Sequence, residues 1–170
     1  MSALAKYFHA QQKQVSGYDK TASAITTSLA SLGIKIAFKD AIESIEAPYL
    51  NPEKTLVITT PAIPKTSTLL KTFKIRNFKV IKRAEALGLI TNNTKCLAVG
   101  GTHGKTTTTS ILGHLMFECD QKVTAFFGGI SENYKSNLIQ NGSAITVVEA
   151  DEFDRSFLSL KPYLACITSI

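Results

Sequence analysis

The chain has 170 residues, of which 44% are hydrophobic, and it carries a formal net charge of +6 at neutral pH. The apolar fraction is ordinary for a globular protein and excludes a disordered chain, while the length accommodates one domain or one and a fraction. The mild basic excess suits phosphate-bearing ligands, but the basic residues show no interleaved aromatic stripe, so we expect no nucleic-acid binding.

The sequence shows neither a signal peptide nor an apolar run long enough to span a membrane. Its three cysteines, Cys96, Cys119 and Cys166, are far apart and lack metal-binding spacing. We expect them to be buried small hydrophobes in a reducing compartment. These features predict a cytoplasmic protein and leave its oligomeric state open.

The first half of the chain alternates between helical and extended patterns. Helices are expected at 3–8, 22–32 and 67–78, and strands at 14–17, 34–38, 56–59 and 79–82. This alternation predicts an α/β fold with a Rossmann-like parallel sheet. The polar stretch within 87–94 suggests a boundary between a domain of residues 1–93 and a second domain of residues 94–170.

The second half begins with an apolar strand at 95–99, followed by a glycine-rich loop and a helix that ends near residue 117. Further strands are expected at 123–127, 144–148 and 164–170. Gly128 and Gly129 are interpreted as a turn, and the polar segment 128–142 as a surface loop. The pattern predicts a second α/β unit of the kind that binds phosphate after its first strand.

The glycine-rich loop is the strongest functional signal in the chain. Glycines between a strand and a helix allow backbone N–H groups to approach an anion, and the helix N-terminus adds unpaired donors. Lys105 is expected to reach the β- and γ-phosphates of ATP, and the Thr106 hydroxyl to bind Mg²⁺. Val99 stands where the general phosphate-loop pattern has a glycine. The predicted nucleotide-binding residues are Gly101, Thr102, His103, Gly104, Lys105, Thr106 and Thr107.

A second part of the site is expected where the strand at 144–148 ends in a run of carboxylates. Ligands of open α/β sheets bind at the carboxyl ends of the strands, and an acid there can hold Mg²⁺ beside a phosphate loop. Glu149 is the first acid after the strand, and we predict that it is the metal ligand together with Thr106. The alternative is that Glu149, Asp151, Glu152 and Asp154 form a solvated loop.

The stretch Gly-Thr-His-Gly-Lys-Thr-Thr at 101–107 resembles the ATP loop of the Mur ligase family of peptidoglycan synthesis. The acidic stretch 149–158 resembles the family's acidic segment, and 1–5, 15–19, 60–64 and 82–85 resemble parts of its N-terminal domain. The resemblance therefore covers essentially the whole chain. It implies ATP-dependent joining of L-alanine to UDP-N-acetylmuramate through an acyl phosphate, with Lys105 and His103 as catalytic residues and ATP and Mg²⁺ required.

The resemblance also places the UDP-sugar near Asp19, Thr60 and Arg83. Each residue has a structural alternative: an N-cap for Asp19, a rigid turn for Thr60 and a surface salt bridge for Arg83. For His103 the alternative is a loop side chain that only packs. Two other functions stay open, namely a murein peptide ligase of the same family and a nucleotide-binding fragment without turnover.

The family's first strand and glycine loop would precede Met1, and its central domain, with a metal-binding histidine, would continue beyond Ile170. The chain ends on an apolar strand pattern, which needs partners to bury it. We expect a fragment of a longer ligase, inactive as a ligase by itself.

Overall fold

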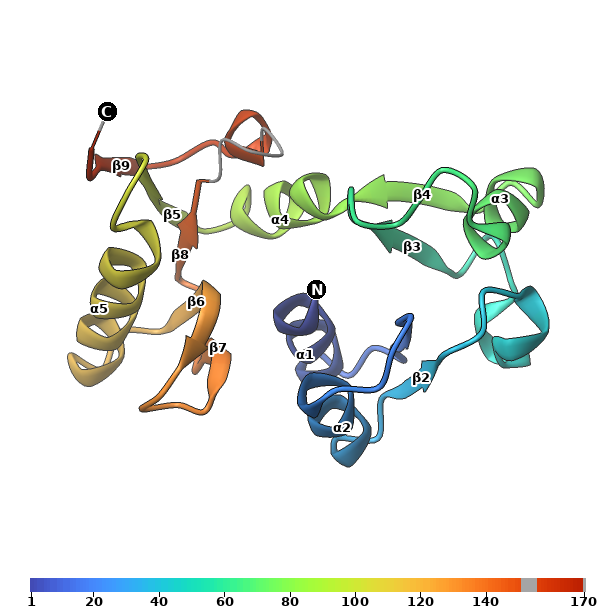
Figure 1. Ribbon diagram of the computed structural model, residues 1–170. Coiled ribbons are helices and arrows are strands. Elements are labelled where there is room, and N and C mark those ends of the chain that lie inside the picture. The colour runs from blue at the N-terminus through green and yellow to red at the C-terminus, as the bar shows by residue number, and fades with distance from the viewer. Residues whose placement is uncertain (151–155, 170) are drawn as a thin grey trace. The chain divides into compact units, whose positions relative to one another are not determined.

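The computed structural model describes residues 1–150 and 156–169 (Figure 1). The chain divides into two compact units, Met1–Arg83 and Ala84–Ile170. The sequence-based boundary between 93 and 94 falls later in the chain and stays a prediction about independently folding domains. Across the described residues, no helix has both the length and the apolar character that crossing a membrane requires.

The first unit contains two pairs of parallel strands with helices beside them. Strand β1 pairs with β2, and β3 pairs with β4. Its elements are α1 (Ser2–Ala10), β1 (Ser16–Tyr18), α2 (Ala24–Ser31), β2 (Lys35–Ala37), the 3-10 turns η1 (Ile42–Ser44) and η2 (Ala47–Tyr49), β3 (Leu56–Thr59), α3 (Thr68–Ile75) and β4 (Lys79–Lys82). The order of helices and strands is the predicted one.

A cluster of aromatic and aliphatic side chains fixes α3 against β3 and β4. Leu69 and Phe73 on one face of α3 are buried together with Phe78, and Phe73 meets Phe78 edge to face at 4.8 Å between ring centroids. Val57 and Val80 pack against this cluster from the two strands. Burying three large apolar side chains in this way stabilises the small sheet.

The N-terminus of α3 is held by a carboxylate from a distant part of the sequence. Asp40 accepts hydrogen bonds from the Leu69 and Thr68 N–H groups at 2.9 and 3.0 Å and from the Ser67 hydroxyl at 2.8 Å. The pKa of Asp40 is lowered, first by the Leu69 N–H and then by the Ser67 hydroxyl. An anion at this helix end supplies acceptors to backbone donors that the helix leaves unpaired.

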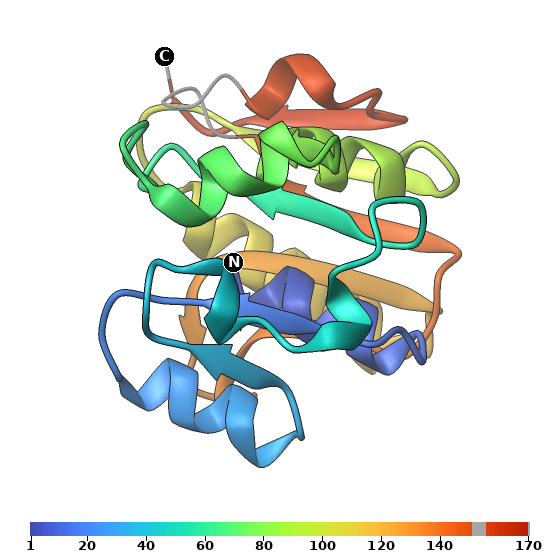
Figure 2. The same cartoon turned by 90° about the vertical axis from the view of Figure 1, so that its right-hand side faces the viewer.

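The second unit is a five-stranded sheet with helix α5 packed on one face, as both views show (Figures 1 and 2). The strand order is β7-β6-β8-β5-β9, and only β7 runs antiparallel to its neighbour. Its elements are α4, which begins at Arg83 (Arg83–Thr91), β5 (Lys95–Gly100), α5 (Lys105–Glu118), β6 (Val123–Ser131), β7 (Ser136–Gln140), β8 (Ile145–Glu149), the 3-10 turn η3 (Ser156–Ser159) and β9 (Leu164–Ile167).

The core of this unit lies between α5 and the central strands. Val123, Ala125 and Val147 are fully buried, and Leu112 and Met116 of α5 pack against them. Gly113 allows the close approach of the helix, because a Cβ there would stand 2.7 Å from the Ala125 Cβ. Close packing of α5 on β6 fixes the position of the helix N-terminus at the carboxyl edge of the sheet.

The structure corrects three predictions about this unit. Gly128 and Gly129 lie inside β6 rather than in a turn, and the predicted surface loop 128–142 contains the end of β6 and all of β7. Helix α4 extends to Thr91, within the stretch 87–94 in which the sequence-based boundary was placed. Cys96 is buried as predicted, but Cys119 and Cys166 are exposed.

Candidate nucleotide-binding site

The glycine-rich loop connects β5 to α5, as the sequence predicts. Strand β5 ends at Gly100, and α5 begins at Lys105 with Gly104 as its N-cap. Gly101 and Gly104 have φ angles of 121° and 80°, in the region that favours glycine. The loop conformation therefore depends on glycine at both positions, and it leads directly into a helix N-terminus, where backbone N–H groups attract an anion.

The residues that follow β9 hold the loop in place. The Thr168 N–H donates to the Gly100 carbonyl at 3.0 Å, and the Thr168 hydroxyl donates to the His103 carbonyl. Ser169 accepts from Thr102 N–H through its carbonyl at 3.1 Å and from His103 N–H through its hydroxyl at 2.9 Å. These contacts fix both sides of the loop.

Contact with this segment also explains why position 101 is a glycine. A Cβ on Gly101 would stand 2.5 Å from the Thr168 hydroxyl oxygen and 2.7 Å from the Ser169 carbonyl oxygen. The latter is a backbone atom that cannot rotate away. Any side chain at 101 would therefore move the loop relative to β9.

Lys105 lies over the loop that precedes it. Its Nζ donates a hydrogen bond of 2.5 Å to the Gly101 carbonyl. This contact places the ammonium charge beside the loop and next to the first turn of α5. Thr102, His103 and Thr107 are exposed at the same end of the sheet, where an anion bound to the loop would meet them.

Glu149 and Thr106 are brought together as predicted from the strand ends. Strand β8 lies parallel to β5 with Glu149 opposite Val99. The Thr106 hydroxyl donates to Glu149 Oε2 at 3.2 Å, and the Gly128 N–H donates to Glu149 Oε1 at 2.7 Å. The carboxylate is thus fixed beside the phosphate loop by one contact from α5 and one from β6.

The oxygen atoms at this position suit a hard cation. Mg²⁺ prefers oxygen ligands and is often held by only one or two protein groups together with phosphate and water. A carboxylate and a hydroxyl 3.2 Å apart at the mouth of a phosphate loop fit that pattern. Among the described residues no group of three His, Cys, Asp or Glu side chains forms a metal cluster. Asp151, Glu152 and Asp154 lie outside the described residues.

The three predicted UDP-sugar residues follow the carboxyl ends of strands in the first unit. Thr60 and Arg83 follow β3 and β4 at neighbouring positions, because Thr59 and Lys82 are opposite each other in the parallel pair. Asp19 follows β1 and accepts a hydrogen bond from the Thr21 N–H at 3.3 Å. The N-cap alternative for Asp19 is wrong, since α2 is capped by Ser23 in a capping box.

The charges of Asp19 and Arg83 both affect the pKa of the Met1 α-ammonium group. The pKa of the Met1 α-ammonium group is lowered by burial and, to a lesser degree, by the charge of Arg83, while the charge of Asp19 opposes this shift. Asp19 and Arg83 therefore both lie near enough to Met1 for their opposite charges to act on its ammonium group.

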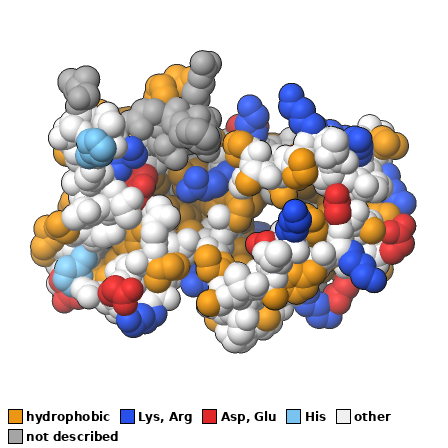
Figure 3. Space-filling model, viewed as in Figure 1, with side chains coloured by type: hydrophobic (Ala, Val, Ile, Leu, Met, Phe, Trp, Pro, Cys, Tyr) orange, Lys and Arg blue, Asp and Glu red, His pale blue; other side chains and the backbone are white. Residues whose placement is uncertain are grey.

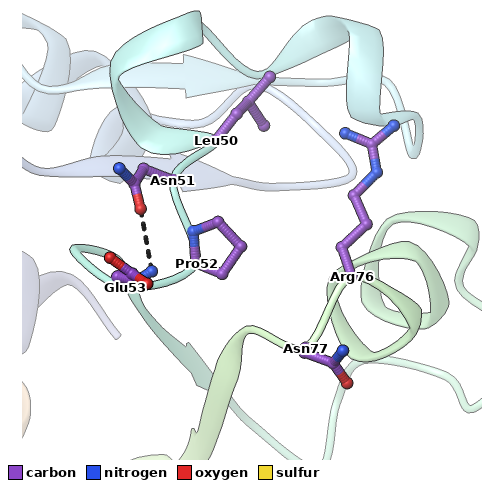
Figure 4. A pocket seen from close by; sticks show the side chains of 6 residues that line it. All are labelled: Leu50, Asn51, Pro52, Glu53, Arg76 and Asn77. Carbon is purple, nitrogen blue, oxygen red and sulfur yellow. Dashed lines mark hydrogen bonds between the residues drawn. The ribbon is translucent and has the colours of Figure 1, made fainter.

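A hollow of about 670 Å³ lies at the opposite end of these strands (Figure 4). It is lined by Leu50, Asn51, Pro52, Glu53, Arg76 and Asn77. The first four residues precede β3 and the last two precede β4. The hollow is therefore at the amino ends of the strands, away from Thr60 and Arg83, and it is not the predicted UDP-sugar site.

Comparison with known proteins identifies the family of the chain. The profile described as "Mur ligase family, catalytic domain" matches residues 1–95, more than half of the chain, and ends before the glycine loop. A protein of Flavobacterium psychrophilum named UDP-N-acetylmuramate–L-alanine ligase is 59% identical over 170 residues, which are 100% of this chain and 38% of that protein.

Two solved structures have the same fold. One is the UDP-N-acetylmuramate–alanine ligase of Thermotoga maritima, with a TM-score of 0.86 and 27% identity over 99% of this chain and 39% of that one. The other is the UDP-N-acetylmuramate:L-alanyl-γ-D-glutamyl-meso-diaminopimelate ligase of Neisseria meningitides, with a TM-score of 0.83 and 23% identity over 99% of this chain and 56% of that one. The second likeness concerns the fold alone.

The chain belongs to the Mur ligase family. It spans about 38% of the length of the curated relatives that it matches. The predicted fold class, a Rossmann-like unit followed by the start of a phosphate-loop unit, is confirmed by the parallel strands and by the solved structures of similar fold.

Sequence reasoning did not identify Gly128, Thr168 and Ser169 as part of the site. The signal for Thr168 and Ser169 was present, because polar residues directly follow the strand at 164–167. Their role required knowing that β9 lies next to β5, which the sequence does not state. For Gly128 the sequence pattern predicts a turn, whereas the structure places this residue in β6 beside Glu149.

Proposed function

We propose that the chain supplies the UDP-sugar-binding and ATP-binding parts of a ligase that joins L-alanine to UDP-N-acetylmuramate in peptidoglycan synthesis. Residues 1–93 form the sugar-nucleotide part and residues 94–170 the start of the ATP-binding part in this proposal. The observation that carries it is the contact of Thr106 with Glu149 beside the Lys105 loop. The name and 59% identity of the Flavobacterium relative support the choice of substrates.

The residues of the loop fit phosphoryl transfer, which needs neutralised charge and fixed geometry rather than a protein nucleophile. Lys105 and the N–H groups at the start of α5 bind the phosphate oxygens. Thr106 and Glu149 would hold Mg²⁺, which would supply neutralisation of the phosphate charge. His103 is exposed in the loop, and its proposed role is contact with the substrate that receives the phosphoryl group.

The proposed reaction has two steps. The lactyl carboxylate of UDP-N-acetylmuramate attacks the γ-phosphorus of ATP, which gives an acyl phosphate and ADP. The amine of L-alanine then attacks the acyl carbon, and inorganic phosphate and a proton leave as the amide forms. ATP and UDP-linked sugars are intracellular metabolites, so the proposal places the reaction in the cytoplasm.

Asp19, Thr60 and Arg83 have the chemistry to hold the UDP-sugar. An acid at a strand end can accept from a ribose or uracil group, and the planar fork of Arg83 suits a pyrophosphate. Their role is to hold the carboxylate of the sugar in a fixed position, which contributes to rate through proximity.

The ATP part of the proposal is tested on the chain itself. We expect calorimetric titration to show binding of Mg·ATP that weakens about 10- to 150-fold in Lys105→Ala, the equivalent of one charged contact of about 1.5–3 kcal/mol. Lys122→Ala, an exposed lysine in the same unit, serves as the matched control. Equal binding by the wild type and Lys105→Ala would remove Lys105 from the site.

The reaction is tested in a chimera in which this chain replaces the matching 38% of the Flavobacterium psychrophilum relative. We expect ADP release that requires both L-alanine and UDP-N-acetylmuramate and that is lost in Lys105→Ala at an unchanged melting temperature. Release that instead requires the tripeptide of recycled murein would favour the murein peptide ligase. A folded chimera that binds ATP without turnover would favour the nucleotide-binding fragment.

A further inference from the structure

Every charged residue in one segment of the first unit is Lys or Arg. Residues 54–84 contain eight Lys and Arg and no Asp or Glu. The eight are Lys54, Lys65, Lys71, Lys74, Arg76, Lys79, Lys82 and Arg83. The segment holds more than a third of the 19 basic residues of the chain, and only Arg83 is used by the proposed function.

Helix α3 concentrates part of this charge on one side. Leu69 and Phe73 are buried against the strands, so the opposite side of the helix faces water. Lys71, Lys74 and Ile75 lie there at i, i+3 and i+4 spacing and are all exposed. Arg76 and Lys79 follow immediately and are exposed as well. We call Lys71, Lys74, Ile75, Arg76 and Lys79 the basic face.

Ile75 is the unusual member of the basic face. Its exposed fraction is 79%, higher than that of any other large hydrophobic side chain among the described residues. Figure 3 shows blue Lys and Arg side chains, with hydrophobic atoms between them, over the part of the molecule where α3 and β4 lie in Figure 1. An aliphatic side chain held in water among cations has no role in the core of this unit.

The charges of the basic face are not neutralised within the first unit. The structure gives no ion pair to Lys71, Lys74, Arg76 or Lys79 in the ranges it describes. Asp40 is bound at the other end of α3, at its N-terminus. A surface with this uncompensated charge attracts a polyanion.

Glu53 is the one acid among the six residues that line the hollow, to which Arg76 of the basic face also contributes (Figure 4). Its N–H is bonded to the Asn51 side chain at 3.0 Å. The negative charge of Glu53 repels an anion inside the hollow. The anions are therefore expected over Lys71, Lys74 and Lys79 rather than inside the hollow.

We propose that the basic face binds an anionic phospholipid surface, with the lysines over the headgroup phosphates and Ile75 inserted between them. Short basic amphipathic helices bind membranes in this way, by charge attraction together with burial of apolar side chains. A nucleic acid is the less suitable polyanion because bases are bound by stacking on aromatic side chains. The aromatic residues of α3 and the following turn, Phe73 and Phe78, are buried.

The expected strength is that of reversible peripheral binding. A Lys or Arg near an anionic surface increases partitioning about fivefold. The three lysines of the basic face therefore give an increase of about a hundredfold at low salt, to which Ile75 adds. In about 1 M salt the Debye length falls to about 3 Å, and this attraction is largely lost.

The test is flotation of the chain with vesicles of equal parts phosphatidylglycerol and phosphatidylcholine, compared with phosphatidylcholine alone. We expect binding only to the anionic vesicles and only at low salt. Lys71→Glu/Lys74→Glu should reduce it by at least about 25-fold, from fivefold for each lost lysine. Lys13→Glu/Lys122→Glu changes the net charge equally at exposed lysines elsewhere and should retain most binding.

A third variant tests the apolar contact. Ile75→Asn should weaken vesicle binding severalfold without changing its salt dependence, whereas Ile111→Asn, at a side chain 55% exposed on α5, should not. Thermal melts of all variants ensure that folded proteins are compared. The proposal is overturned by absence of binding to anionic vesicles, by equal losses in the two double variants, or by salt-sensitive binding to duplex DNA in place of vesicles.

Discussion

Replacing Glu149 by glutamine separates the structural role of this residue from its role as a metal ligand. In the wild type, Oε1 accepts from the Gly128 N–H at 2.7 Å and Oε2 accepts from the Thr106 hydroxyl at 3.2 Å. A glutamine in the same position keeps both contacts, because its amide oxygen accepts from Gly128 and its NH₂ group donates to Thr106 Oγ1. Glu149→Gln should therefore leave the free energy of unfolding within about 0.5 kcal/mol of the wild type.

The negative charge, in contrast, is lost completely. Removing a group that only supports a metal ligand costs about 10- to 100-fold in metal affinity, and loss of the ligand itself costs at least as much. We expect the Mg²⁺ concentration needed for half-maximal ATP binding to rise at least about tenfold, or about 1.4 kcal/mol. The assay is a Mg²⁺ titration at fixed ATP that follows bound nucleotide, with a thermal melt of each variant.

Two further variants sharpen the result. Glu149→Ala leaves the Gly128 N–H without its acceptor, so it should lower the melting temperature as well as the Mg²⁺ response. Glu152→Gln and Asp154→Asn, which lie outside the described residues, should shift the titration less than Glu149→Gln. A Glu149→Gln protein that titrates like the wild type, while one of these two shifts, would show that the ligand is wrongly assigned.

Three other features of the described residues can be tested by substitution or labelling. Asp40→Ala should destabilise the protein by about 1–2 kcal/mol, the usual value of a helix cap, whereas Asp19→Ala, which loses one 3.3 Å bond, should cost less. Because the pKa of Asp40 is lowered in the folded state, its contribution is present above the ordinary aspartate pKa and is lost as the pH falls through the lowered value. Melts of the two proteins from neutral to acid pH should therefore show the difference shrinking. Gly101→Ala should cost about 1–3 kcal/mol through its positive φ and weaken ATP binding in calorimetry by moving the loop. Burial raises the pKa of the Cys96 thiol to about 11, so mass spectrometry should find that a thiol reagent labels the two exposed cysteines at neutral pH and reaches Cys96 only in denaturant.

The parts of the site that sequence reasoning predicted are those carried by local patterns. The glycine spacing and the preceding apolar strand predict the strand-to-helix junction to within a few residues, and Lys105 lies at that junction. The prediction of Glu149 rests on the general placement of ligands at strand ends. The register of β8 against β5 puts this residue beside the loop.

The parts that were not predicted depend on contacts between distant segments. Asp40 accepts hydrogen bonds at the N-terminus of α3, and even its nearest partner in the sequence, Ser67, is 27 positions away. No local sequence pattern links the two residues. Thr168 and Ser169 stabilise the loop only because β9 is adjacent to β5 in the strand order. Strand order is a property of the packed sheet, so the sequence indicated two polar residues after a strand without indicating what they bind.

Gly128 shows how a correct observation led to a wrong interpretation. Two adjacent glycines are typical of a turn, but glycine inside a strand also marks a bulge or a place where another group comes very close. Both apply here, since the pairing of β6 with β7 is irregular between Phe126 and Ser131. A Cβ on Gly128 would stand 2.6 Å from Glu149 Oε2 and 2.9 Å from Oε1.

The absence of a side chain at Gly128 is therefore a condition for the position of Glu149. The backbone of β6 approaches near enough to donate its N–H to the carboxylate, and the same approach leaves no room for a Cβ. A larger residue at 128 would displace the carboxylate from the Thr106 hydroxyl and from the cation that we propose between them and the phosphates. Gly128 therefore belongs to the proposed nucleotide site, although it contributes no side chain to it.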